Sequence, residues 1–204
     1  MTVERFDCAG FGKKPGVVLL HGSDGLTRSG LYEAAARTLA SAGFTVFLPH
    51  YFEVSGDRRA AYSELQIKFP IWLDAIEDAL DEIIADSAVA QNRIGVVGIS
   101  LGGALALALS ARDARIKAVV NYFGYLPEPI QQARRFAPTL ILHGDADRVI
   151  PVSNAYAIER LLKARGTVVE SQIYPGQGHG FEGGALSDAA SRTATFLRRY
   201  LSAG

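Results

Sequence analysis

The stretch 96–103, VVGISLGG, places a single serine among glycines at the point where an apolar run gives way to helix formers. Ser100 has Gly98 two residues before it and Gly102 two residues after it. A serine on a sharp strand-to-helix turn projects its hydroxyl outward, and flanking glycines remove side chains that would collide with neighbouring backbone. The helix N-terminus that follows offers amide groups to a developing oxyanion. The pattern is typical of a nucleophile elbow, and the alternative is a helix-capping serine on a tight turn.

A serine hydroxyl needs a base before it becomes an effective nucleophile. The chain has four histidines, and His179 lies in YPGQGHGF, a glycine-rich loop after the last predicted strand. A histidine on such a loop can reach over the edge of a sheet, so we take it as the base. His21 and His143 each end a predicted strand, and we interpret both as structural residues that hold loops through their ring N–H groups. His50 follows a proline and is a candidate for a pocket wall.

The base requires an acid that fixes its tautomer and stabilises the imidazolium. Two aspartates follow the predicted strand TLILHG. Asp145 comes directly after a glycine and is better interpreted as a turn former that caps backbone amides. Asp147 lies further out on the loop, and we prefer it as the acid. The resulting chain order, Ser100, Asp147, His179, is that of α/β-hydrolases.

A second oxyanion donor is expected from the loop after an early strand, and VVLLHGSDG (17–25) has that form. We take the amides of Ser23 and Leu101 as the pair that forms the oxyanion hole, with Gly22 as the alternative to Ser23. A glycine-rich loop can also cradle phosphate, but this one lacks the Gly-Lys-Ser/Thr signature of such loops.

Short apolar runs alternate with helical patterns along the whole chain. The runs mostly lack polar alternation, which is typical of strands buried on both faces of a parallel sheet. We therefore predict one α/β-hydrolase domain over 1–204, an α/β fold with an open, mostly parallel sheet and helices on both faces. The expected strands lie within 15–22, 43–50, 93–100, 116–124, 137–145 and 167–176, and the expected helices span 30–42, 70–86 (with Pro70 at the first helical position), 101–111, 153–165 and 185–202.

Pocket walls should come from residues that follow strand ends on the same edge as Ser100. Those residues are aromatic, which suits a small apolar or aryl ester, and they are Tyr51, Phe52, Phe123, Tyr125 and Phe181. The stretch 52–69 has no clear period and is interpreted as a lid or a pocket wall. Its basic residues Arg58, Arg59 and Lys68 form either a solvated face or a contact for an anionic substrate.

Composition excludes several other classes. Lysine plus arginine equals aspartate plus glutamate at 21 each, so neither a nucleic-acid surface nor an acidic docking arm is indicated. No apolar run approaches the roughly 20 residues of a membrane span, and the first ten residues lack the apolar core of a signal peptide. The single cysteine, Cys8, fits a reducing compartment. We expect a cytoplasmic monomer or small homo-oligomer with no metal and no cofactor.

The motifs LHGSDG, LPHYF, GISLGG, LHGDADRVIP and PGQGHGF resemble the dienelactone hydrolase family of α/β-hydrolases over roughly residues 15–200. The family implies a serine or cysteine nucleophile, an aspartate and a histidine, which fall on Ser100, Asp147 and His179. The lactone-cleaving members use cysteine where this chain has serine. They also carry an early acidic residue, near which Asp24 lies, and an arginine shortly after the histidine, which this chain lacks.

The expected function is hydrolysis of a small-molecule ester or lactone through an acyl-enzyme. A thioesterase or a small serine peptidase is the alternative within hydrolases, because one triad serves all acyl transfers. A hydrolase-fold binding protein with an idle triad is the alternative from another class.

Overall fold

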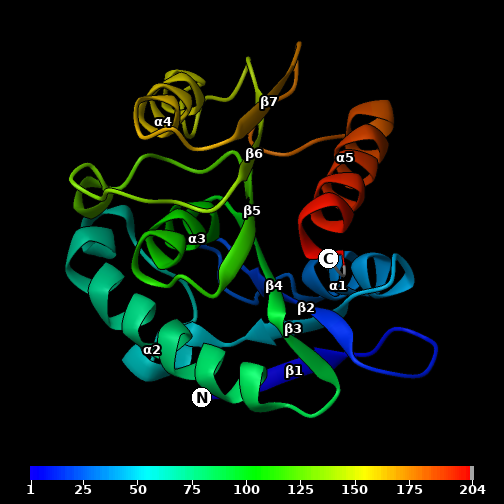
Figure 1. Cartoon of the computed structure of the whole chain (residues 1–204). Coiled ribbons are helices and arrows are strands. Elements are labelled where there is room, and N and C mark those ends of the chain that lie inside the picture. Colours follow the sequence, from blue (N-terminus) through cyan, green and yellow to red (C-terminus); the bar gives the residue numbers. More distant parts are fainter. Residues whose placement is uncertain (203–204) are drawn as a thin grey trace.

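The structure is a computed structural model that describes residues 1–202, and a seven-stranded sheet runs through its middle (Figure 1). The strand order is β1-β3-β2-β4-β5-β6-β7, and every neighbouring pair is parallel except the antiparallel pair β1 and β3. The predicted open, mostly parallel sheet is confirmed. The strands are β1 (Val3–Phe6), β2 (Lys14–Leu20), β3 (Thr45–Pro49), β4 (Val89–Ile99), β5 (Ile116–Tyr122), β6 (Thr139–Gly144) and β7 (Val169–Tyr174).

Helices cover both faces of the sheet (Figure 1). One face carries α1 (Ser29–Ser41) and α5 (Gly183–Leu201), and the other carries α2 (Leu65–Ala85), α3 (Leu101–Arg112) and α4 (Ser153–Ala164). Successive side chains of β2 pack on opposite faces of the sheet: Val18 packs on the face covered by α2 and α3, and Leu19 packs on the face covered by α1 and α5. Both faces of each central strand are therefore buried, which explains why these strands read as unbroken apolar runs.

Several elements differ from the sequence prediction, among them β4, which begins at Val89 although the strand was expected within 93–100. Strand β1 was not expected, because its four residues VERF include two charges and it lies at the sheet edge. Helix α2 begins at Leu65, so Pro70 lies inside the helix rather than at its start. The buried spacing explains this, since Leu65 and Phe69 extend the apolar face of α2 toward its N-terminus.

The parallel strands present their carboxyl ends at one edge of the sheet. The loops after β2, β4, β5, β6 and β7 therefore meet there, which is where open α/β sheets place their sites. Across residues 1–202, none of the helices combines the length and apolarity that a membrane crossing requires.

Candidate active site

Ser100 lies on the turn between β4 and α3 with a φ of 57° and a ψ of −115°. This left-handed backbone is strained for a residue with a side chain. A Cβ on Gly98 would lie 2.1 Å from the Gly102 carbonyl oxygen, and one on Gly102 would lie 2.3 Å from the Leu20 carbonyl oxygen. Both glycines are thus required by close backbone packing, and the spacing of the motif follows from the geometry of the turn.

Ser100, His179 and Asp147 form one hydrogen-bonded chain. His179 Nε2 lies 2.9 Å from Ser100 Oγ, and His179 Nδ1 lies 2.8 Å from Asp147 Oδ2. A carboxylate can only accept, so Nδ1 carries the ring proton and Nε2 is free to accept the serine proton. The Asp147 side chain is completely buried, and its other oxygen accepts the amides of Val149 and Ile150 at 2.8 and 2.9 Å. The arrangement can transfer a proton from the serine to the imidazole.

The remaining groups of this loop have other contacts. Asp145 Oδ1 accepts the Gly176 amide at 2.7 Å, as expected for a turn former. His143 is buried, and its Nε2 donates to the Ile150 carbonyl oxygen at 2.8 Å while lying 3.4 Å from Asp147 Oδ2. Its ring therefore ties the end of β6 to the segment that Asp147 caps.

The loop after β2 lies directly beside the elbow. A Cβ on Gly22 would lie 3.4 Å from Ser100 Cβ. The Gly22 amide donates to Tyr32 Oη at 2.9 Å, and the Tyr32 hydroxyl donates to Asp24 Oδ1 at 2.8 Å. Because the Gly22 amide already has a partner, Ser23 remains the predicted second oxyanion donor. No sequence pattern indicated a role for Tyr32, because its contact with this loop depends on how α1 packs.

Residues 51–60 brace the same loop from behind. The Tyr51 hydroxyl donates to the His21 carbonyl oxygen at 2.7 Å, and the Ala60 amide donates to the Ser23 carbonyl oxygen at 2.9 Å. A Cβ on Gly25 would lie only 2.2 Å from the Arg58 carbonyl oxygen. Part of the stretch that lacked a sequence period is thus a support for the loop at Ser23.

Two of the five aromatic residues predicted to form the pocket lie beside Ser100. Phe123 lines the same cavity as His179, with the two ring centroids 4.7 Å apart, and Tyr125 lines a neighbouring cavity. Phe123 has a φ of 38°, so its backbone is strained like that of the serine.

The other three predicted pocket residues lie away from the cavities at Ser100. Tyr51 is fully buried and stacks on His21 with centroids 4.0 Å apart, and Phe52 packs edge to face against the same ring. The chain enters a short 3-10 helix at Tyr51–Ser55 directly after β3, which turns both side chains beneath the loop. Phe181 is buried against Phe123, with centroids 5.3 Å apart.

Two cavities meet at Ser100. The smaller cavity, of about 320 Å³, is lined by residues that include Leu101 and Tyr125. The larger cavity, of about 580 Å³, is lined by residues that include His179, Arg28 and Arg59. The Arg59 guanidinium is held at the rim by Thr27 Oγ1, 3.2 Å from its Nη2. Ser23, Tyr62, Ser100 and Val149 border both cavities.

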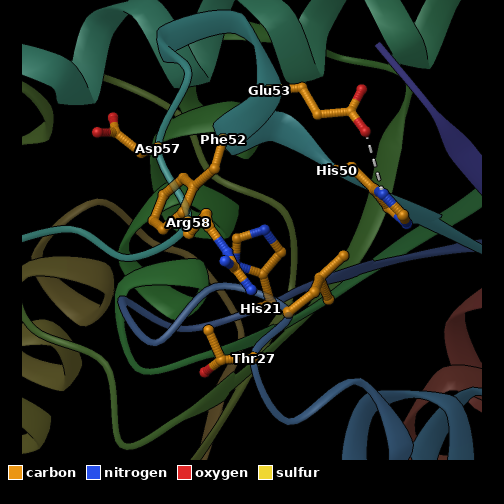
Figure 2. A pocket seen from close by; sticks show the side chains of 8 residues that line it. His21, Thr27, His50, Phe52, Glu53, Asp57 and Arg58 are labelled. Atoms are coloured by element: carbon orange, nitrogen blue, oxygen red, sulfur yellow. Dashed lines mark ion pairs between the residues drawn. The ribbon is translucent and has the colours of Figure 1, made fainter.

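A third cavity, of about 200 Å³, lies behind the loop and does not include Ser100 (Figure 2). His21, His50 and Arg58 line it, and Lys68 stands apart in a salt bridge to Asp57 at 2.8 Å. His50 Nδ1 lies 3.3 Å from Glu53 Oε1, the contact dashed in Figure 2. Among residues 1–202, no three histidine, cysteine, aspartate or glutamate side chains gather closely enough to hold a metal ion.

His21 should make folding stability depend on pH. The residue is 1% exposed, its Nδ1 donates to the Gly22 carbonyl oxygen, and burial lowers its pKa from 6.5 to about 4. Below pH 6.5 His21 becomes protonated in the unfolded chain, whereas in the folded chain it stays neutral down to about pH 4. The free energy of unfolding therefore falls as the pH drops through that window. The expected loss between pH 7 and pH 4.5 is about 2 to 3 kcal/mol.

Urea unfolding at the two pH values measures this loss. His21→Phe should reduce the difference between the two pH values, whatever it does to stability at pH 7. The residual pH dependence should keep the same sign, because burial also lowers the pKa of His143. An equal pH dependence in the variant and the wild type would contradict the assignment to His21.

Comparisons with known proteins point to one family. A model of the dienelactone hydrolase family matches residues 6–200. A carboxymethylenebutenolidase of Rhodococcus opacus is 26% identical over 92% of this chain and 82% of its own length. A carboxymethylenebutenolidase homolog of Xenopus tropicalis is 30% identical over 44% of this chain. The chain spans 37% of that Xenopus protein, and 56% of a relative from Methylorubrum extorquens.

Solved structures share the fold at low sequence identity. A dienelactone hydrolase-like promiscuous phosphotriesterase from metagenomic libraries superposes with a TM-score of 0.83 at 20% identity, covering 98% of this chain and 99% of that one. Esterase PE8 superposes with a TM-score of 0.80 at 21% identity, with the same coverage. The elbow, the order of the three hydrogen-bonded residues and the family match over nearly all of the sequence lead to one conclusion: the chain has the α/β-hydrolase fold and belongs to the dienelactone hydrolase family.

Proposed function

We propose that the protein is a serine hydrolase that cleaves a small ester or lactone through an acyl-enzyme. The observation that carries this proposal is the continuous hydrogen-bond chain from Ser100 through His179 to the buried Asp147. Each residue has the geometry that its role requires. The backbone of Ser100 is strained, the hydrogen bond to Asp147 selects the required tautomer of His179, and Asp147 accepts two backbone amides.

The reaction begins when Ser100 Oγ attacks the substrate carbonyl and its proton passes to His179 Nε2. The negative charge on the carbonyl oxygen is stabilised by the Ser23 and Leu101 amides. The bond to the leaving oxygen then breaks, and His179 returns the proton to that oxygen. A water molecule next gives a proton to His179 and attacks the acyl carbon. The bond between that carbon and Ser100 Oγ then breaks, His179 returns the proton to Oγ, and the acid is released.

Charge in the larger cavity supports a substrate that bears an acid group. Arg28 and Arg59 line the same cavity as His179. The one carboxylate among its described lining residues, Asp24, accepts the Tyr32 hydroxyl. A substrate carboxylate near the scissile bond would therefore meet net positive charge there. The relatives named carboxymethylenebutenolidase fit such a substrate by their name. This chain would perform the hydrolysis with an oxygen nucleophile, Ser100.

The thioesterase and peptidase alternatives use the same three residues and differ only in the substrate. They have relatives of their own, including an acyl-protein thioesterase 1 of Gibberella zeae that is 28% identical over 57% of this chain. A binding protein with an idle triad is disfavoured by the strain at Ser100, for which binding alone offers no physical reason.

We further propose a cytoplasmic location, supported by the single cysteine, Cys8.

The test is hydrolysis of p-nitrophenyl acetate together with labelling by a fluorophosphonate, a probe that reacts with activated serines. Turnover plus a label on Ser100 supports a serine hydrolase. Labelling with turnover of a thioester but not of the oxygen ester would favour the thioesterase. Neither labelling nor turnover by a folded protein would leave only the binding protein.

Tyr32→Phe should lower kcat roughly tenfold and leave KM almost unchanged. The variant removes the hydroxyl that accepts the Gly22 amide and donates to Asp24, so the loop at Ser23 loses its fixed position. One neutral hydrogen bond is worth about 1 kcal/mol, and the loss should appear in the transition state, where the Ser23 amide acts.

Tyr174→Phe is the matched control for this change in steady-state kinetics. Its hydroxyl also donates to an aspartate, Asp188 at 2.8 Å, but it lines neither cavity at Ser100. Equal effects of the two variants on kcat would show that Tyr32 has no specific role.

A further inference from the structure

The two cavities at Ser100 are not equivalent, because His179 lines only the larger one. In acyl transfer the leaving oxygen must come within hydrogen-bond reach of the base that returns its proton. The leaving group therefore occupies the larger cavity. With the carbonyl oxygen at the predicted Ser23 and Leu101 amides, the acyl chain extends away from the leaving group, and the smaller cavity is the space that borders Ser100 without His179.

The smaller cavity has a mainly apolar and uncharged lining. Tyr125 and Ile150 line it, together with Leu65 from the first turn of α2. Burial raises the pKa of Tyr125 to about 12, which is consistent with a ring set in apolar surroundings. Within residues 1–202 no charged side chain lines this cavity, and its polar members include the amides of Gln66 and Asn154.

The rim of this cavity is also apolar and open to solvent. Tyr62 is 69% exposed and Val149 is 46% exposed, so two large side chains that line the cavity also reach solvent. A volume of about 320 Å³ equals on the order of ten water-sized groups. That is enough for a chain well beyond acetyl.

We propose that the groove of Leu65, Tyr125 and Ile150 is an acyl-binding site that selects esters of medium-chain apolar acids. This inference rests on the proposed function and assigns the two halves of the substrate to opposite sides of the serine. The acid-derived half is apolar and lies in this groove, whereas the alcohol-derived half lies with His179. The acyl chain stays in the groove after Ser100 is acylated, while the leaving group departs from the other side.

The experiment compares kcat/KM for p-nitrophenyl acetate, butyrate, hexanoate and octanoate, which share one leaving group. Each fully buried methylene should raise kcat/KM roughly fourfold, and a half-open groove should give about two- to fourfold per methylene. Leu65→Trp should fill the groove and lower the octanoate-to-acetate ratio at least tenfold. Leu65→Ala should raise the same ratio.

Two matched tryptophan variants complete the design. Ile67→Trp lies two residues further along α2, is 75% exposed as isoleucine and lines neither cavity, so it should keep the wild-type ratio. Leu31→Trp lies in the cavity of His179 and should change all four esters by the same factor. Circular dichroism and thermal unfolding verify that each variant is folded.

The outcomes separate the two proposals. If no ester is hydrolysed and the fluorophosphonate does not label Ser100, the proposed function fails. If the esters are hydrolysed but kcat/KM does not depend on chain length, the function stands and the acyl site is overturned. The acyl site is also overturned if Leu31→Trp, rather than Leu65→Trp, changes the octanoate-to-acetate ratio.

Discussion

Ser100→Ala is expected to lower kcat for p-nitrophenyl butyrate by roughly a million-fold. The substitution removes the oxygen that bonds to His179 Nε2 at 2.9 Å and leaves nothing for the acyl group to join. Amides at Ser23 and Leu101 would still bind the carbonyl oxygen, so a residual rate above that of water alone should remain.

The control for this variant is Ser187→Ala, which changes an exposed serine on α5 whose hydroxyl donates only to the Gly183 carbonyl oxygen. Both variants should stay folded, because Ser100 Oγ has its one contact with His179. Thermal unfolding verifies this point. A Ser100→Ala protein that keeps a tenth of the wild-type rate would refute the nucleophile assignment.

Asp147→Asn is expected to lower kcat about 10⁴-fold without unfolding the loop. The asparagine oxygen can still accept the Val149 and Ile150 amides, which leaves its NH₂ group facing His179 Nδ1. A donor at that position favours the tautomer with its proton on Nε2, and that nitrogen can no longer accept the proton of Ser100.

Asp145→Asn tests whether the loss of kcat is specific to position 147. It lies on the same loop, and its oxygen caps the Gly176 amide rather than contacting His179. Steady-state kinetics on both variants should show the large loss only for Asp147→Asn. A comparable loss in both would indicate that general disturbance of the loop, and not the tautomer, determines the rate.

The elements closest to the chemistry could be predicted from sequence because local geometry specifies them. The elbow at Ser100 needs glycines at fixed spacing, since a Cβ on Gly98 or Gly102 would collide with backbone. The choice of Asp147 over Asp145 followed from turn chemistry, and the structure gives the two carboxylates the corresponding contacts. Their catalytic roles remain predictions until the variants are measured.

The parts that could not be predicted depend on contacts between distant segments. Tyr51 and Phe52 follow a strand, like Phe123, but the 3-10 helix they form turns them under the loop. The contact of Tyr32 with Asp24 requires α1 to pack beside β2. Residues 52–64 show no period, because part of their contact with the loop is made by backbone atoms, such as the bond from Ala60 to Ser23, which leave no side-chain pattern.

The chain contains a single tryptophan, Trp72, and its position makes it a built-in optical reporter. The indole is fully buried on α2, and its Nε1 donates to Ser55 Oγ at 2.7 Å. Its ring centroid lies 4.6 Å from that of Phe52, within the segment that supports the loop at Ser23. Tryptophan emission therefore comes from one place, and loosening of this segment would expose the indole to water and shift that emission to longer wavelengths. Ligand-dependent movement behind the serine can thus be followed in the unmodified protein, without an attached dye.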